Sequence, residues 1–112
     1  MRRAPVREDI DWSYVDHVQR LRPERLLELV KPGDGPTAWD LVKSEPFCYF
    51  GYEVVSFLES IAEHGVRRPV IVWQDPDTKQ GWLTNGHHRL WYAVEARVPS
   101  IPVVVRKTFR FS

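Results

Sequence analysis

Five consecutive residues carry the groups best suited to chemistry in this chain: Asn85, Gly86, His87, His88 and Arg89. Gly86 permits a sharp turn and lets a ligand approach the backbone closely. The residues after it are predicted to open a helix, whose first amide groups lack intrahelical partners and sit at the positive end of the helix dipole. Such a helix start attracts anions, phosphate above all. A simple turn glycine followed by a surface arginine would give the same five residues, and both interpretations stay open from this segment alone.

The side chains of this segment suit anion binding better than metal binding. Arg89 falls in the first helical turn, where its guanidinium can grip a phosphate with two donors. His87 and His88 add donors, or proton-transfer groups that titrate near neutral pH. Adjacent helical residues point ~100° apart, so the two histidines are poorly placed to share one ion. Asn85 is expected to cap the helix, and no metal site is predicted.

A strand, a turn and a helix must position these residues. The continuous apolar run 69–73 predicts a buried strand, and 81–84 is its expected hairpin partner, with Trp73 and Trp82 facing each other across the hairpin. The periodicity after the turn predicts a helix over 87–97. The glycine turn therefore lies between a strand and a helix.

Further elements surround this unit. Residues 1–13 lack periodicity and are expected to form an N-terminal arm, whereas 14–112 form one domain. The remaining predicted elements are a strand 14–21, a helical turn 24–30, a short helix from Thr37 that stops before Pro46, a helix 52–64 closed by Gly65, and a strand 101–105. This order predicts an α+β domain.

The composition of the chain limits the number of domains and the kinds of site that it can form. The chain has 112 residues and 43% apolar content, enough for one core. A net charge of +1 gives no overall attraction to nucleic acid, although clustered arginines, including the pair Arg67 and Arg68 and the group around Arg106, could form a basic face. The one cysteine, Cys48, excludes an internal disulfide framework and a Cys-based zinc site.

The same composition predicts a protein that works in the cytoplasm. No apolar run reaches the ~20 residues of a membrane helix. The charged N-terminus has no apolar segment behind it, so we do not expect a secretory signal. No membrane partner is predicted.

Three segments resemble the ParB/sulfiredoxin superfamily. Residues 57–72 are similar to the pattern "L-x-x-S-I-x-x-x-G" followed by a "P-I-x-V" strand, and 83–90 resemble the "G-[EH]-[RH]-R" box of ParB-like domains. The strand 101–105 falls where that pattern expects one. The resemblance covers roughly 15–107 and is strongest over 57–105. Ordered matches over ~50 residues are more specific than one short motif.

The resemblance implies a fold and a site. The fold is a small mixed sheet of about four strands packed with helices. The site is a phosphate or nucleotide pocket at Gly86, His87, His88 and Arg89, and the ligand a nucleoside triphosphate (CTP or ATP) with Mg²⁺. Arg67 and Arg68 are nearby candidates, or merely exposed turn arginines. Glu59 and Glu63 lie on a helix that faces this region in relatives; with His87 and His88 they are candidate catalytic groups, or else the solvated side of that helix.

Two departures from the family limit the chemistry. Sulfiredoxins place a cysteine where this chain has His87, which argues against sulfinic-acid repair. Relatives that act as small-molecule kinases have an aspartate where this chain has Asn85, which weakens the case for phosphoryl transfer.

Three functions therefore compete. The leading one is a ParB-like domain that binds a nucleotide or phosphate and could act on nucleic acid, even as a nuclease, although no compact acidic cluster accompanies the glycine turn. The second is a non-catalytic regulatory module for a protein partner, of phage or mobile-element origin. The third is a small-molecule kinase that uses Glu59 or Glu63. Whether the protein is an enzyme stays open.

Overall fold

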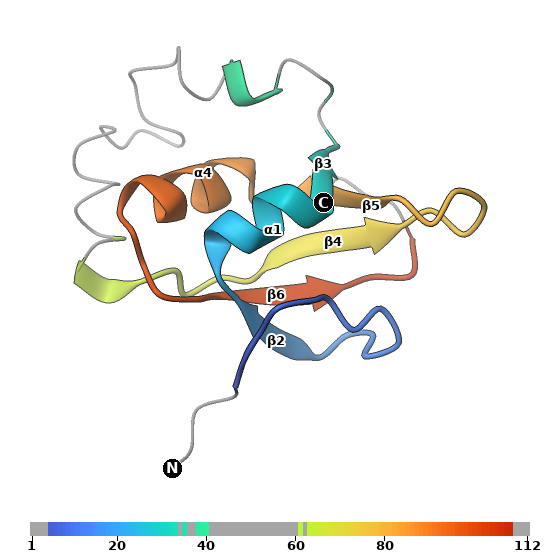
Figure 1. Ribbon diagram of the computed structural model, residues 1–112, viewed down its shortest axis with the longest axis horizontal. Coiled ribbons are helices and arrows are strands. Elements are labelled where there is room, and N and C mark those ends of the chain that lie inside the picture. Colours follow the sequence, from blue (N-terminus) through green and yellow to red (C-terminus); the bar gives the residue numbers. More distant parts are fainter. Residues whose placement is uncertain (1–4, 34, 36–37, 41–60, 62, 109–112) are drawn as a thin grey trace.

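A six-stranded mixed sheet organises the protein (Figure 1). The computed structural model describes residues 5–33, 35, 38–40, 61 and 63–108. The strands are β1 (Val6–Arg7), β2 (Val18–Leu21), β3 (Val30–Pro32), β4 (Val70–Gln74), β5 (Gly81–Asn85) and β6 (Ile101–Val105). The described residues also form the helices α1 (Pro23–Leu29) and α4 (His87–Glu95). The spatial order of the strands is β1-β2-β6-β4-β5-β3.

The sheet confirms the predicted α+β class and adds two strands to the expected four. The pairs β2–β6 and β4–β5 are antiparallel, and β4–β6 is parallel. The missed strands, β1 and β3, are the two edges of the sheet and pair in parallel with β2 and β5. They have only two and three residues, too few for an alternating pattern to be visible in the sequence.

Element ends differ from the expected ones for local reasons. The first long strand begins at Val18 rather than at residue 14. Helix α1 begins at Pro23, whose fixed φ suits the first helical position, and Val30 leaves it to start β3. Helix α4 ends at Glu95 instead of residue 97, because Arg97 has a left-handed φ of 56°. The expected helix 52–64 lies largely outside the described residues, as does Cys48.

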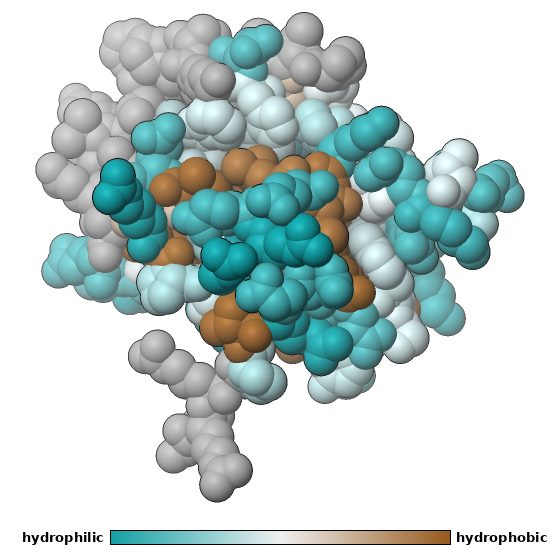
Figure 2. Space-filling view, in the orientation of Figure 1, coloured by the Kyte–Doolittle hydropathy of each residue, from teal (hydrophilic) through white to brown (hydrophobic). Residues whose placement is uncertain are grey.

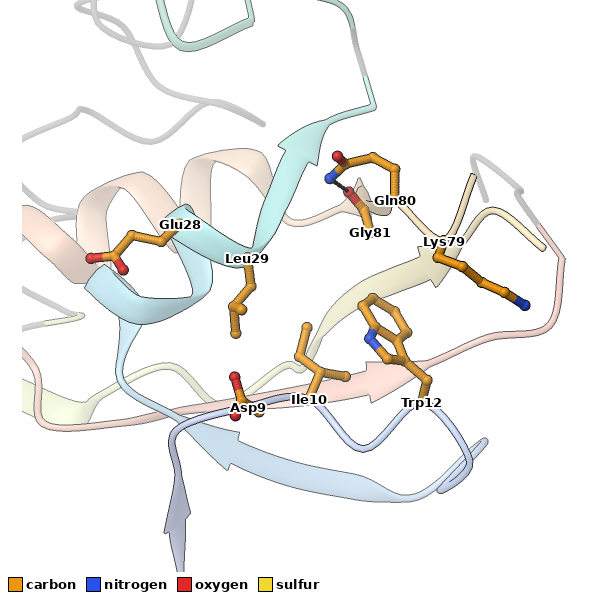
Figure 3. A pocket seen from close by; sticks show the side chains of 8 residues that line it. All are labelled: Asp9, Ile10, Trp12, Glu28, Leu29, Lys79, Gln80 and Gly81. Carbon is orange, nitrogen blue, oxygen red and sulfur yellow. Dashed lines mark hydrogen bonds between the residues drawn. The ribbon is translucent and has the colours of Figure 1, made fainter. Parts of the chain in front are cut away.

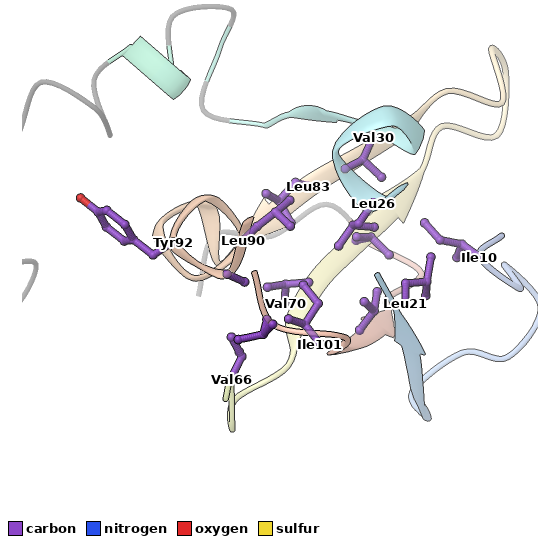
Figure 4. Packing of buried hydrophobic residues seen from close by; sticks show 14 of the residues in the cluster. Ile10, Leu21, Leu26, Val30, Val66, Val70, Leu83, Leu90, Tyr92 and Ile101 are labelled. Carbon is purple, nitrogen blue, oxygen red and sulfur yellow. The ribbon is translucent and has the colours of Figure 1, made fainter. Parts of the chain in front are cut away.

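The hydrophobic core lies between the helices and one face of the sheet. Leu26 of α1 and Leu90 of α4 are completely buried and lie beside the strand residues Leu83 and Val70 (Figure 4). Figure 1 shows α1 and α4 running side by side. Alternate strand residues face this core, namely Leu21, Val70, Val72, Leu83, Ile101, Val103 and Val105.

The opposite face of the sheet, called here the second face, presents the intervening residues. Trp73 and Trp82 are direct cross-strand partners, as the hairpin prediction required, and both are half-buried. Lys31 of β3 is the direct partner of Trp82 on the other side. The chain after β6 also reaches this face, because the Trp73 Nε1–H donates to the Lys107 carbonyl at 3.1 Å.

The segment 5–13, expected to be an arm, lies against the sheet. Ile10 is buried, and the buried Gln19 side chain bonds both backbone groups of Asp11, accepting from its N–H at 2.8 Å and donating to its carbonyl at 2.7 Å. Arg25 of α1 holds the same segment through the Glu8 carbonyl at 2.8 Å and the Asp9 carboxylate at 3.1 Å. The domain boundary near residue 13 stays a prediction.

Charged side chains cover the outer surface of α1. Figure 2 shows hydrophilic residues gathered over this helix, with hydrophobic ones around them. Arg25 also pairs with Glu28 at 2.9 Å, and the two carboxylates that it bonds, Glu28 first and Asp9 second, raise its pKa. Ser13 donates from its hydroxyl and its N–H to the Asp11 carboxylate, which lowers the pKa of Asp11. No helix of the described chain is long and apolar enough to cross a membrane.

Candidate functional site

The glycine turn joins β5 directly to α4. Gly86 is the N-cap of α4 and has a left-handed backbone, with φ 99° and ψ 24°. Its carbonyl accepts the first helical hydrogen bond, from the Leu90 N–H at 2.9 Å. A Cβ at this position would lie 2.7 Å from Val70 Cγ1. Both the backbone angle and the close approach of β4 therefore require glycine here.

Arg89 turns back from the first turn of α4 toward the end of β5. Its Nη2 donates to Asn85 Oδ1 at 3.3 Å, and its side chain is half-buried. Gly86 takes the N-cap position that the sequence suggested for Asn85. Asn85 therefore positions the guanidinium of Arg89.

A pocket of about 520 Å³ opens beside this turn. This is within the size range of small-molecule sites, about 300–1,000 Å³. Its lining residues come from the start of β4, the end of β5, the first turn of α4 and the chain after β6; they are Arg68, Pro69, Ile71, Asn85, Arg89, Arg106 and Thr108. Among the residues that the structure describes, three guanidinium groups and no carboxylate line it. The arrangement suits an anionic ligand with several acceptor oxygens.

Sheet register explains why distant residues meet here. Ile71 of β4 is the direct partner of Asn85, so the turn lies beside the first half of β4. Strand β6 runs parallel to β4, and the Arg106 N–H continues that ladder by donating to the Val72 carbonyl at 2.9 Å. The chain then passes Trp73 and brings Thr108 to the pocket.

Arg106 is held from outside the pocket by an ion pair. Its Nη1 lies 2.5 Å from the Asp16 carboxylate, and both side chains are about half exposed, 46% and 64%. Asp16 has a left-handed φ of 64°, and its N–H donates to the Val105 carbonyl at 3.0 Å. A phosphate that binds Arg106 would share this guanidinium with Asp16.

Some of the residues selected from the sequence line this pocket, and others do not. Arg68, Arg89 and Asn85 line the pocket, and Gly86 is the N-cap of α4 between the last two of them. Arg67 is exposed and lies outside the lining residues. Sequence reasoning did not select Ile71, Arg106 or Thr108 for the site; only the basic cluster near the end of the chain drew attention to Arg106.

The two histidines lie elsewhere on α4. His87 is buried, with its ring 5.6 Å from that of Trp39, which in turn stacks on Trp91 at 5.6 Å. His88 lies beside Tyr92, with 6.4 Å between ring centroids. Neither histidine is among the lining residues of the pocket. His87 therefore faces Trp39, which lies outside α4, whereas His88 faces Tyr92 on α4 itself.

Glu63, the acidic candidate that the structure describes, is not among the lining residues of the pocket. Glu63 is exposed, with His64 as its neighbour at 3.7 Å, and Glu59 lies outside the described residues. Among the residues that the structure describes, no three His, Cys, Asp or Glu side chains cluster as metal ligands would.

A second pocket of about 470 Å³ lies between the N-terminal segment and the start of β5. Figure 3 shows Ile10 and Trp12 directed toward Leu29 and Gly81. Its two carboxylates, those of Asp9 and Glu28, are already paired with Arg25. Its described lining residues offer no comparable set of anion-binding groups.

Comparison with known proteins supports the fold. Neither a family model nor a curated protein sequence matches the chain. Among solved structures, a C-terminally truncated chromosome-partitioning protein ParB from Caulobacter crescentus, complexed with CTP-γ-S, is 24% identical with a TM-score of 0.52. The match covers 82% of this chain and 45% of that one, so this chain spans less than half of the ParB structure.

A sulfiredoxin from Arabidopsis thaliana is similar as well. It is 17% identical, with a TM-score of 0.50, and the match covers 82% of this chain and 86% of that one. The chain therefore has the ParB/sulfiredoxin fold, which confirms the fold that the resemblance predicted. At these identities the likeness establishes the fold alone.

Proposed function

We propose that this protein binds a nucleotide through its phosphate groups in the pocket beside Gly86. The observation that carries the proposal is the convergence of Arg68, Arg89 and Arg106, from three separate parts of the chain, on one pocket whose described lining contains no carboxylate. The similar ParB structure was solved with CTP-γ-S, which supports a nucleotide as the class of ligand to test.

The geometry supports binding more than catalysis. Arginine presents paired donors that match two oxygens of a phosphate, and three guanidiniums suit a di- or triphosphate better than a single charge. Asn85 orients Arg89 before any ligand arrives, which lowers the entropy cost of binding. Hydrolysis would also need a group that activates water, and the described lining residues include no carboxylate or histidine.

Calorimetry tests the proposal. CTP, ATP, ADP and GTP are titrated into the protein with and without Mg²⁺, and the titrations are repeated with Arg89→Ala and Arg89→Lys. Saturable binding is expected for at least one nucleotide. Arg89→Ala should weaken it by about 10- to 100-fold, because a charge-assisted hydrogen bond contributes ~1.5–3 kcal/mol. Arg89→Lys should retain part of the affinity, since it keeps the charge but loses the paired donors.

Absence of binding to all four nucleotides, by a protein with a normal circular dichroism spectrum, would refute the proposal. It would also favour a protein partner, for which Val6, Tyr14 and Val18 offer exposed apolar side chains near one end of the sheet. The kinase alternative gains no support from the described residues, because Glu63 is exposed and lies outside the lining of the pocket.

A further inference from the structure

Basic and aromatic side chains alternate across the second face of the sheet. Lys31, Trp82 and Trp73 stand on three neighbouring strands and are paired in register, Lys31 with Trp82 and Trp82 with Trp73. Their positions are therefore about 4.8 Å apart from strand to strand. The Lys31 ammonium lies 5.9 Å from the centroid of the Trp82 ring, within cation–π range.

This row leads directly into the arginine pocket. Trp73 and Ile71 lie two residues apart on β4 and so face the same side of the sheet, and Ile71 lines the pocket. The Trp73 indole also donates to the Lys107 carbonyl, between the lining residues Arg106 and Thr108. Cations thus flank the two indoles at both ends, Lys31 on one side and the pocket arginines on the other.

We propose that this surface binds single-stranded nucleic acid, with phosphates in the arginine pocket and at Lys31 and with bases stacked on Trp82 and the exposed part of Trp73. The proposal rests on the phosphate-binding role of the pocket proposed above. A groove that combines positive charge with aromatic side chains holds single strands without sequence preference, because every base has a face that can stack on an indole. A duplex hides those faces within its own stack.

The positive charges around this surface favour a polyanionic strand as its ligand. The row and the pocket contribute Lys31, Arg68, Arg89 and Arg106, and Arg106 is paired with the Asp16 carboxylate. With a net charge of only +1, the whole molecule attracts polyanions weakly, so this local concentration of cations would direct the strand to the second face. An acidic peptide would meet the same cations but would gain little from the two indoles.

Fluorescence anisotropy tests the proposal with labelled oligothymidine, oligouridine and a duplex of matched length over a series of salt concentrations. We expect both single strands to bind more tightly than the duplex, and the two single-strand arms distinguish DNA from RNA as the better ligand. Trp82→Leu should weaken single-strand binding by about 5- to 100-fold through loss of stacking. Trp82→Phe, which keeps an aromatic face, should restore most of the affinity.

A matched pair of charge variants tests the lysine. Lys31→Ala should make the slope of log K against log salt shallower by about 0.7, the value for one phosphate contact on a single strand. Arg22→Ala, at an exposed arginine beside α1 that pairs with Glu8, should leave the slope unchanged. Far-UV circular dichroism and thermal melting check that each variant folds.

Several results would overturn the proposal. Duplex binding as tight as single-strand binding is one, and unchanged single-strand affinity in Trp82→Leu is another. If mononucleotides bind in an Arg89-dependent manner and neither oligonucleotide binds more tightly than they do, this proposal fails and the phosphate pocket stands. If neither mononucleotides nor oligonucleotides bind, both proposals fail together.

Discussion

At the scale of single residues, the turn before α4 couples backbone conformation to side-chain position. Gly86 has a left-handed φ and lies against Val70, while Arg89 Nη2 lies 3.1 Å from the point that a Cβ on Gly86 would occupy. A side chain at Gly86 would therefore press on both β4 and the guanidinium. The space that places Arg89 beside Asn85 exists because residue 86 has no Cβ.

Gly86→Ala should destabilise the fold through strain and through collision with Val70. A left-handed non-glycine backbone costs about 1–3 kcal/mol, and overpacking against a buried side chain costs about as much again, for a total of about 2–5 kcal/mol. Gly35→Ala is the matched control, because Gly35 has a similar φ of 111° but open space around the position of its Cβ. Urea unfolding measures both losses. Equal losses in the two variants would show that contact with Val70 contributes nothing.

At the scale of elements, leucines on two helices attach the helical layer to the sheet. Leu26 of α1 and Leu90 of α4 are completely buried against strand residues, whereas Leu27 is only partly buried at the edge of the core. Helix α1 has only seven residues, so its own hydrogen bonds cannot keep it folded. Its stability must come from packing.

Leu26→Ala should therefore cost about 2–5 kcal/mol in the free energy of unfolding, by loss of buried area and by the cavity that remains. Leu27→Ala, one residue away on the same helix, should cost less than half as much. Chemical denaturation of the two variants gives the comparison. A loss in Leu27→Ala equal to that in Leu26→Ala would contradict the packing described here.

Local patterns predict some of these elements well and others not at all. The hairpin 69–84, the helix after Gly86 and the strand 101–105 were predictable because periodicity, glycine and proline act within a few residues. The edge strands β1 and β3 were not, because two or three residues become a strand only when a neighbouring strand offers its free edge.

The residues of the candidate site likewise differ in whether a local sequence pattern could identify them. Asn85, Gly86 and Arg89 belong to one local motif and could be selected from the sequence. Arg106 and Thr108 join them only through the parallel register of β4 and β6 and the return of the chain past Trp73. That register depends on the whole sheet, so no local pattern predicts it.

At the scale of the whole molecule, the hydrophobic core and the proposed nucleic-acid surface lie on opposite faces of the sheet. Helices α1 and α4 cover one face of the sheet and close the core there. The second face carries Trp73, Trp82 and Lys31 and borders the arginine pocket. Substitutions on the second face can therefore change ligand affinity with little effect on the core, which makes the proposed functions testable in folded variants.

The adjacent arginines before β4 provide the most direct test of the phosphate pocket. Arg68 lines the pocket, whereas Arg67 does not, and both are exposed, so neither substitution should disturb the core. The measurement is the dissociation constant for CTP with Mg²⁺, and for the other nucleotides of the panel, in Arg68→Ala and Arg67→Ala. We expect Arg68→Ala to weaken binding about 10-fold, through loss of one charge-assisted contact, and Arg67→Ala to change it less than about twofold. Equal losses in the two variants, or an unchanged affinity in Arg68→Ala, would contradict the assignment of the pocket.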